Sequence, residues 1–411
     1  MMRERADLLN DQCLTGLEVF QLTTEQIPSS HIYMEAQIFT PDSKRLIVHR
    51  SAHPHGSDPK DPAHQYLICD LEQGGELRPI TTELGATAPS IAPAGDVLFY
   101  FTNETEPAQG GKLTLKRVNL DGTQREQICV VDSVLPGAPG PFSRPYPLST
   151  VSSDGQRVAI SGFLGDGSAA DAPWGLLVFD VPTGRVELIL QGSTWCNVHP
   201  QYSRSKNASA SRDLLVQENH GNECDASGQF TKLTGGNGAD IHVIADDGSN
   251  LRDLPWGRDG NEFCQGHQCW IGDSTRALTS TGKREPKCAE LIDARAVPHV
   301  GHEGLKTPGG VRNDLSRQHP QPDFYHFATD AAGSRLITDA GPRDGGGALW
   351  LGTIPADETQ AIEDWTYLMN PGSSWQKHTH IHPFLSPDSK TGFFNSDESG
   401  ESQCYMVRGW E

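Results

Sequence analysis

The residues best suited to chemistry lie near the carboxyl end, where His378, His380 and His382 occupy every second position. Because side chains alternate along an extended strand, histidines at this spacing share one face. Imidazole suits Zn, Cu, Fe and Ni, and the amide carbonyl of the nearby Gln376 extends the range to Mn. The following Ser386-Pro387-Asp388 is typical of a tight turn. The pattern predicts a metal-binding strand that ends in a turn; a solvated polar strand edge is the alternative.

The composition is that of a globular protein with many turns. Of the 411 residues, 43 are Gly and 28 are Pro, and such a content favours short strands joined by turns. The net charge is −20, and since Lys and Arg form no run, we expect no nucleic-acid partner. An anionic ligand would therefore need a local cation, which a metal ion could supply.

The sequence also bears on the compartment. No stretch approaches the roughly 18 apolar residues of a spanning helix, so we expect no membrane partner. Nine cysteines, odd in number and irregularly spaced, favour reduced thiols over a disulfide framework. The first residues lack the apolar core of a secretion signal. A cytoplasmic location is predicted, and the oligomeric state is left unknown.

A strand–turn–strand motif recurs along the chain. Seven copies, roughly 50 to 70 residues apart, are typical of a propeller built from four-stranded antiparallel blades. The sequence therefore predicts an all-β fold, a seven-bladed β-propeller, with residues 1–411 as a single domain. The copies lie at 36–48, 88–100, 149–160, 198–203, 267–278, 326–337 and in the histidine stretch itself.

Further strands complete the expected blades. In the third copy, residues 174–180 read as a third strand and 185–190 as an outer strand. The last blade runs out after its third strand at 403–407, so we expect the N-terminal segment 17–23 to supply its outer strand and close the ring. The segment 288–320 has weak periodicity and is interpreted as a strand pair with a long surface loop.

Histidines recur at one position of the motif. The innermost strand of each blade lines the central channel of a propeller, and the residues just before each turn face that channel. Histidine at this position in five blades favours a metal site at one mouth of the ring; channel histidines hydrogen-bonded to water are the alternative. These residues are His31, His199, His267, His326, His380 and His382.

Several of these segments together resemble a known family. The N-terminal stretch 15–23, the repeated Ser-Pro-Asp turns, 199–203, His326-Phe327 and His380-Ile381-His382-Pro383 are similar to those of oligogalacturonate lyases. The resemblance covers nearly the whole chain, and its histidines are more specific than its turns. It implies a seven-bladed propeller that cleaves short uronides by β-elimination with Mn²⁺, and so a role in pectin degradation.

The resemblance implies a set of metal ligands. The family's fourth ligand is a Gln three residues before the His-x-His pair, where this chain has Lys377, with Gln376 one step further back. Either Gln376 or His378 would then complete the set. The implied metal ligands are His326, His380, His382 and Gln376.

The resemblance also implies a catalytic base. His267, three residues before Trp270, matches the family's proton-abstracting histidine, while Asp240 occupies the place of its catalytic arginine. The candidates to replace that arginine are Arg252, Arg258, His220 and His242. The residues that we assign to substrate binding are His199, His220 and His242.

The expected chemistry starts from a uronic-acid C5 proton, which is weakly acidic. A divalent metal on the substrate carboxylate would stabilise the carbanion that forms when the proton leaves. A neutral His267 would accept this proton, since a histidine suits base chemistry near neutral pH. The 4-linked sugar would then depart from an unsaturated uronide, and an oligouronide is the expected partner.

Other functions remain open at this point. A propeller glycosidase, or a lyase for rhamnose–glucuronate linkages, would use the same channel histidines in different roles. A non-enzymatic binding propeller would need no channel histidines but would need aromatic surface patches. A fold alone does not decide between these.

Overall fold

The computed structural model describes nearly the whole chain. His378, one candidate ligand, lies outside the described residues. The described residues are 1–34, 36–51, 60–104, 111–167, 172–232, 238–258, 261–302, 306–341, 347–376 and 379–410.

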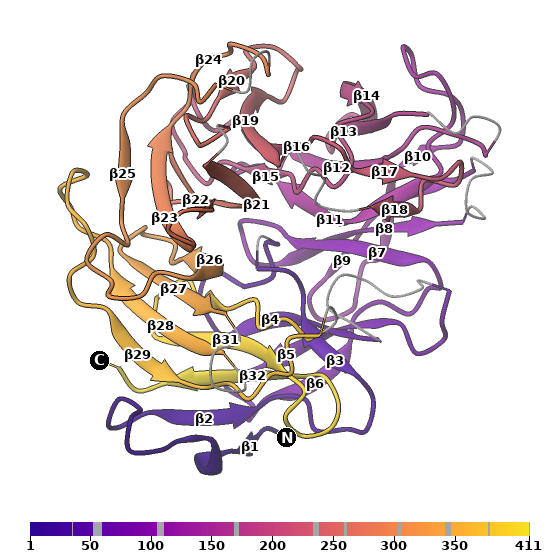
Figure 1. Cartoon of the computed structure of the whole chain (residues 1–411). Helices are drawn as coiled ribbons and strands as arrows, with labels where there is room; N and C mark the ends of the chain where they lie inside the picture. Colours follow the sequence, from indigo (N-terminus) through magenta and orange to yellow (C-terminus); the bar gives the residue numbers. More distant parts are fainter. Residues whose placement is uncertain are drawn as a thin grey trace.

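Seven β-sheets succeed one another around a ring (Figure 1). The first blade contains β3 (Ser29–His31), β4 (Arg45–Arg50), β5 (Gln65–Asp70) and β6 (Glu76–Pro79). The second contains β7 (Ala86–Ile91), β8 (Val97–Asn103), β9 (Leu113–Asn119) and β10 (Glu126–Val131). The third contains β11 (Arg144–Val151), β12 (Arg157–Phe163), β13 (Trp174–Asp180) and β14 (Arg185–Gly192).

The remaining blades follow in chain order. The fourth contains β15 (Gln201–Tyr202), β16 (Asp213–Asn219), β19 (Ala239–Ala245), β20 (Arg252–Asp253) and β24 (Val297–Pro298). The fifth contains β21 (Glu262–Trp270), β22 (Arg276–Lys283), β23 (Cys288–Arg295) and β25 (Arg312–Asp314). The sixth contains β26 (Phe324–Thr329), β27 (Arg335–Ala340), β28 (Ala348–Thr353) and β29 (Thr366–Met369). The seventh contains β30 (Phe384–Leu385), β31 (Thr391–Ser396), β32 (Gln403–Arg408), β2 (Glu18–Gln21) and β1 (Arg3–Glu4).

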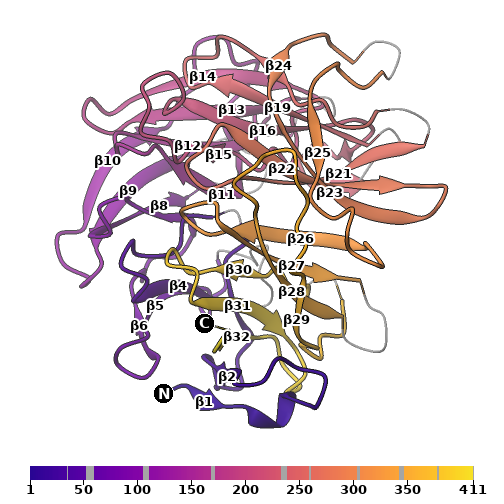
Figure 2. The same ribbon diagram turned by 90° about the vertical axis from the view of Figure 1, so that its left-hand side faces the viewer.

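This architecture confirms the predicted all-β, seven-bladed propeller. The predicted closure is also confirmed, because β2 pairs antiparallel with β32, with Val19 opposite Val407. The only helical element among the described residues is the single turn η1 (Ala6–Leu8). One further strand was not predicted: β1 pairs with the outer side of β2. Figure 2 shows both strands beside β32, at the edge where the two ends of the chain meet.

The recurring turn has the same hydrogen bonds in several blades. In the third blade, Asp154 accepts the hydroxyl of Ser152 at 2.5 Å and the backbone N–H of Gln156 at 2.9 Å. In the seventh blade, Asp388 accepts the hydroxyl of Ser386 at 2.6 Å. An Asp that bonds to backbone two residues further on fixes a tight reversal, so this turn holds each inner strand against the next strand.

Blade four departs most from the expected pattern. Besides its five-stranded sheet it carries the hairpin β17 (Glu223–Cys224) and β18 (Phe230–Lys232). The segment 288–320, interpreted as a strand pair with a loop, supplies strands to two blades. Its β24 crosses back to pair with β20, with Arg252 opposite Pro298. The chain after β24 is thereby held over the outer part of blade four.

Bulges interrupt the inner strands of the fifth and sixth blades. The register of β21 against β22 shifts between Cys264 and Gln268, and that of β26 against β27 shifts between Phe324 and Phe327. A bulge bends a strand and re-aims a side chain. His267 and one other channel histidine, His326, lie within these shifts.

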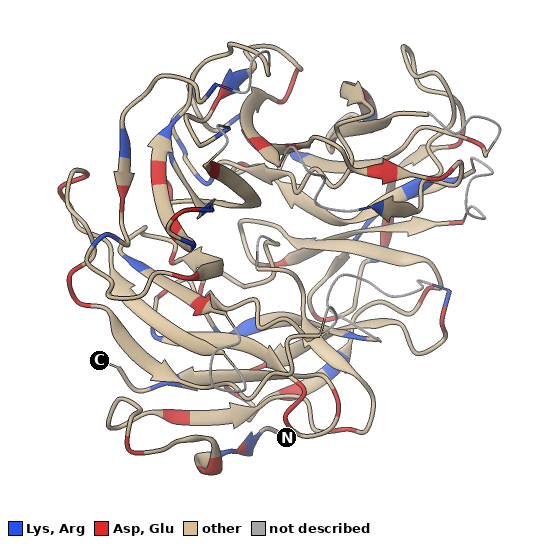
Figure 3. Ribbon diagram, in the orientation of Figure 1, with Lys and Arg blue, Asp and Glu red and all other residues tan. Residues whose placement is uncertain are grey.

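Charge and hydropathy are unremarkable at the level of the fold. In Figure 3, Lys and Arg are scattered over the blades among Asp and Glu. Among the described residues, no helix is both long and apolar enough to span a membrane.

The bulge of β21 leads to a prediction about stability. Gly266 has a φ of +87°, and a Cβ there would lie 2.5 Å from Nε2 of Gln217. We expect Gly266→Ala to lower the free energy of unfolding by roughly 1–3 kcal/mol, because a left-handed backbone is strained for alanine. Denaturant unfolding measures this loss.

Gly309→Ala is the matched control, because a Cβ there would meet nothing within 4 Å. We expect it to leave the stability unchanged. Equal stability of the two variants would mean that the bulge adapts without cost.

Candidate metal centre at one mouth of the channel

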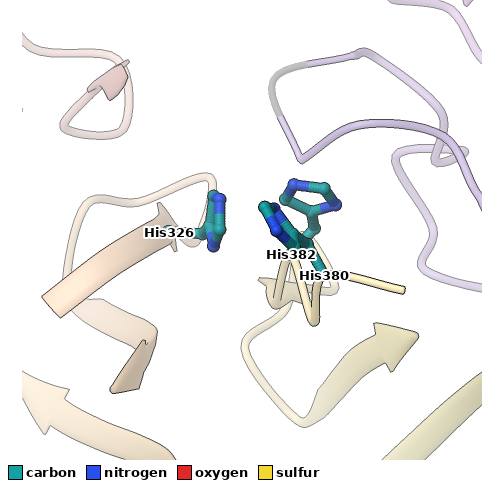
Figure 4. A group of neighbouring side chains, drawn as sticks. All are labelled: His326, His380 and His382. Carbon is teal, nitrogen blue, oxygen red and sulfur yellow. The ribbon is translucent and has the colours of Figure 1, made fainter. Parts of the chain in front are cut away.

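The site histidines occupy the beginnings of inner strands. His326 lies in the first half of β26, while His380 and His382 come directly before β30. Because the inner strands of a propeller run in the same direction, their beginnings meet at one mouth of the channel. Figure 4 shows His326 reaching from one side and the other two histidines facing it from the neighbouring blade.

These three histidines are close enough to share one ion. Each offers a ring nitrogen, and these nitrogens all lie within 4.8 Å of one another. The ring centroid of His326 is 4.3 Å from that of His382 and 5.4 Å from that of His380. His326 and His382 are buried and His380 is half-buried. Three imidazole nitrogens with an open position are a donor set that fits Mn, Fe, Zn or Ni.

A buried carboxylate orients His326. Nδ1 of His326 is 2.7 Å from Oδ2 of Asp339, and its backbone N–H donates to Oδ1 at 2.8 Å. This leaves Nε2 for a ligand, the arrangement typical of metal-binding histidines. Burial raises the pKa of Asp339 to about 8. A cation at Nε2 would favour the ionised carboxylate, which accepts the Nδ1–H.

His267 lies against this group. Its ring centroid is 4.6 Å from that of His326, and its Nδ1 has no hydrogen-bond partner among the described residues. Burial, together with repulsion from His326, His199 and His380, holds the pKa of His267 well below its ordinary value. The ring is therefore neutral and keeps a lone pair beside the three histidines.

His199 approaches from blade four. Its Nε2 is 2.9 Å from the hydroxyl oxygen of Tyr146, and its ring touches that of Tyr33 with centroids 5.0 Å apart. Tyr33 also touches His382, at 4.7 Å. The backbone is left-handed at both His199 (φ 49°) and His382 (φ 45°). Such strain in residues other than glycine concentrates at functional sites.

An aromatic wall borders the group. The ring of Trp375 lies 5.6 Å from that of His380 and 6.1 Å from that of His326. Tyr325 packs edge-on against the same indole at 5.7 Å. The site therefore combines imidazole ligands with an apolar side.

The implied ligand Gln376 and the predicted channel residue His31 take other places. The side chain of Gln376 is exposed. Its backbone carbonyl accepts the N–H of Thr379 at 2.8 Å.

His31 is fully buried against Phe384, with ring centroids 4.6 Å apart. Burial lowers the pKa of His31 to about 4, opposed by hydrogen bonds to the backbone, including that of His382. His31 therefore supports the backbone that carries His382.

His220 and His242 belong to a different group in blade four. Nε2 of His220 is 2.9 Å from Oδ2 of Asp240. Nδ1 of His242 is 2.8 Å from Oδ1 of Asp253. Among the described residues, neither has a ring contact or hydrogen bond to His267 or to the three candidate ligands. Their predicted role in substrate binding stays a prediction.

The candidate arginines are both paired with carboxylates. Arg258 is buried, and its Nε lies 2.7 Å from Oδ1 of Asp240. A guanidinium therefore does lie beside the position where the resemblance implies an arginine, although it comes from elsewhere in the chain. Nη2 of Arg252 lies 2.5 Å from Oδ1 of Asp213. Asp213 begins β16, whereas the residue opposite Asp240, Glu218, lies near the other end of that strand.

Three residues of the site were not predicted from the sequence: Asp339, Tyr33 and Trp375. A lone carboxylate within the apolar strand β27 was a usable signal for Asp339, because buried charges are normally paired. Tyr33 and Trp375 lie in irregular segments, so no periodicity identified them.

Comparison with known proteins supports the fold. No family model matches the chain, and no curated protein matches its sequence. Among solved structures, it is similar to an oligogalacturonate lyase in complex with manganese, with a TM-score of 0.70 and 18% identity over 100% of this chain and 96% of that one. An oligogalacturonate lyase from Vibrio parahaemolyticus gives the same score and identity over 99% and 96%. The β-propeller domain of the Trilobed protease from Pyrococcus furiosus is more distant, with a TM-score of 0.51 and 10% identity over 95% of both chains.

The molecule is thus a seven-bladed propeller with a histidine-lined mouth. Its resemblance to oligogalacturonate lyases, stated above from the sequence, is confirmed at the level of the fold and extends over the full chain.

The contact between Asp339 and His326 leads to a prediction about metal affinity. We expect Asp339→Asn to weaken Mn²⁺ binding by about 10- to 100-fold, the usual effect of losing a carboxylate behind a ligating histidine. Titration calorimetry with Mn²⁺ measures the dissociation constant. Asp357→Asn, in an exposed turn, is the control and should bind as the wild type does. Unchanged affinity in Asp339→Asn would contradict a metal on Nε2 of His326.

Proposed function

We propose that the chain is a metal-dependent lyase that cleaves uronic-acid-containing oligosaccharides by β-elimination, with oligogalacturonate-like substrates. The observation that carries this proposal is the contact of His267 with a three-histidine group whose ring nitrogens lie within 4.8 Å of one another. A base beside a cation site is the pairing that proton abstraction next to a carboxylate requires. The similarity in fold to two oligogalacturonate lyases supports the same reaction.

His326, His380 and His382 would hold the ion, and Mn²⁺ is proposed because one similar structure is a manganese complex. Bound there, a divalent cation supplies positive charge to a substrate carboxylate and stabilises negative charge on the adjacent carbon. The fourth position is proposed for Gln376, whose exposed side chain would have to turn toward the histidines.

The chain's own residues then carry out the elimination. Nδ1 of His267 accepts the C5 proton, the C5–H electrons form the C4–C5 double bond, and the C4–O bond breaks. The departing sugar leaves as an alkoxide that takes up a proton from water, and His267 returns its proton to solvent before the next reaction. His199, which contacts Tyr146 and Tyr33, would bind the sugar. The aromatic side formed by Trp375 limits the access of water.

A second candidate is a lyase for a different uronide, such as a rhamnose–glucuronate linkage. The observation in its favour is that Asp240 stands where the resemblance implies an arginine, with Arg258 already paired to it. A changed carboxylate-binding residue implies a changed sugar next to the cleaved bond.

The cellular setting is also proposed. Nine cysteines are free thiols in the structure, which supports a reducing, cytoplasmic location.

The lyase proposal is tested with metal-reconstituted protein. We expect di- or trigalacturonate to give a product with the ultraviolet absorbance of a conjugated double bond, dependent on Mn²⁺. We expect His267→Ala to reduce this rate by about 100- to 10,000-fold, the usual contribution of a general base, while Mn²⁺ still binds.

Three other results of this assay would contradict the proposal or the assigned base. A product without a double bond would indicate a glycosidase and refute elimination. Bound metal without any product, over a panel of uronides that includes rhamnose–glucuronate oligomers, would leave a binding propeller as the function. Full activity of His267→Ala would remove His267 as the base.

A further inference from the structure

Two cysteines at blade four lie against each other, although they come from separate segments. Cys196 belongs to the segment between β14 and β15, and Cys224 belongs to the hairpin strand β17. Cys196 is part of a buried core cluster, and Cys224 packs half-buried against the same cluster. The thiol of Cys196 donates a hydrogen bond to the sulfur of Cys224. Both are free thiols in the structure, so two neighbouring sulfur atoms lie together without a bond between them.

The hairpin is held in place around this contact. Cys224 stands opposite Phe230 on β18, and directly opposed residues share one face of a sheet. Phe230 stacks on the indole of Trp174, with ring centroids 5.1 Å apart and an interplanar angle of 11°. The Nε1–H of Trp174 donates to Sγ of Cys224 at 3.3 Å. One side chain of blade three therefore contacts both the cysteine and the aromatic ring of the hairpin.

A guanidinium binds the turn of the hairpin. Nη2 of Arg144 donates to Oε1 of Gln229 at 2.6 Å, and Nη1 donates to the backbone carbonyl of Ser227 at 3.4 Å. These residues connect β17 to β18, so a positive charge lies near Cys224. Asp225, next to the cysteine, supplies an opposing negative charge, and its Oδ1 accepts the hydroxyl of Ser227 at 2.7 Å.

These surroundings make the two thiols unequal. The hydrogen bond from Cys196, the indole N–H of Trp174 and the charge of Arg144 together lower the pKa of Cys224, against the opposing effects of burial and Asp225. The same contact with Cys224, together with burial, raises the pKa of Cys196. The thiolate is the form of cysteine that attacks an oxidant, and reactive cysteines lie in partly exposed surroundings with positive charge nearby. Cys224 fits the attacking thiol, and Cys196 fits the partner that keeps its proton.

Access to solvent follows the same order. Cys224 is half-buried, and Glu223 and Asp225 on either side of it are exposed. The side chain of Cys196 is fully buried. A small oxidant therefore meets Cys224 first. A sulfenic acid formed there would have a thiol beside it, which is the arrangement that leads to a disulfide.

We propose that Cys224 and Cys196 form a reversible redox site, in which hydrogen peroxide converts the pair of thiols into a disulfide. In the first step the thiolate of Cys224 attacks one peroxide oxygen, the S–O bond forms, the O–O bond breaks, and the departing hydroxide takes up a proton. In the second step the sulfur of Cys196 attacks Sγ of Cys224, the S–S bond forms, the S–O bond breaks, and the departing hydroxide takes the proton of Cys196. The two thiols lose two electrons and two protons, and one peroxide becomes two water molecules.

The disulfide would tie the hairpin to the segment that carries His199. Nδ2 of Asn219 already donates to the backbone carbonyls of Cys196 at 2.6 Å and Asn197 at 3.2 Å. The backbone of this segment is left-handed at Asn197 and at His199. A covalent link at Cys196 restricts the segment three residues before His199, so oxidation at a surface hairpin would restrict the backbone at the channel mouth.

The test uses the full-length chain, with hydrogen peroxide as the probe. After removal of the peroxide and denaturation, we expect two fewer titratable thiols than the nine of the reduced protein. Peptide mapping by mass spectrometry should show the peptides of Cys196 and Cys224 joined, and dithiothreitol should restore every thiol. A denaturing gel without reductant should show no cross-linked dimer, because the bond forms within one chain.

Three variants separate the steps. We expect Cys224→Ser to keep all of its thiols at the same dose of peroxide. Cys196→Ser should stop after the first step and leave a sulfenic acid at Cys224, which dimedone labels. Cys288→Ser is the matched control, because Cys288 is also half-buried but burial and Glu290 raise its pKa. This control should lose two thiols, as the unsubstituted protein does.

The peptide mapping needs no variant, so the proposal can fail even where a substitution prevents folding. An unchanged thiol count in the treated protein would overturn it, and so would a disulfide that joins other cysteines. Equal loss of thiols from Cys224→Ser and Cys288→Ser would overturn it as well. The thiol count depends neither on the lyase assay nor on bound metal, so either proposal can fail alone.

Discussion

The antiparallel pairing of β2 with β32 is the interaction on which the rest of the structure depends. It joins the two ends of the chain in blade seven and leaves the ring without an open edge between the last blade and the first. His380 and His382 belong to this blade, while His326 comes from blade six. Only a closed ring fixes the spacing of adjacent blades, and that spacing sets the distances among the three imidazoles.

Within the closed ring, local irregularity places the side chains. His267 and His326 lie where the inner strands change register, and His199 and His382 have left-handed backbones. Regular strands would alternate their side chains between neighbouring blades. The irregular positions turn them toward the axis instead. The packing of the sheets on either side offsets the backbone strain at these positions.

Most of the fold could be predicted from the sequence because its signals are local. The turn motif and strand periodicity placed the strand at 174–180, which is β13, and paired the N-terminal strand with the last blade. The two-residue strand β24 could not be predicted, since so short an element has no periodicity. For the site, histidine spacing identified the three candidate ligands. Tyr33 could not be predicted because its contacts with His199 and His382 come from packing between distant segments. Asp339 lies on the strand next to that of His326, and its lone carboxylate was a signal that the histidine pattern did not include.

The position of Tyr33 has a consequence for how two distant blades are held together. The phenol of Tyr33 contacts His199 of blade four and His382 of blade seven. The side chain of Tyr33 is almost completely buried. Blades four and seven are not neighbours, so the tyrosine joins two parts of the propeller that share no sheet contact in sequence order. The position of His382 is therefore coupled to that of His199 through one buried aromatic side chain.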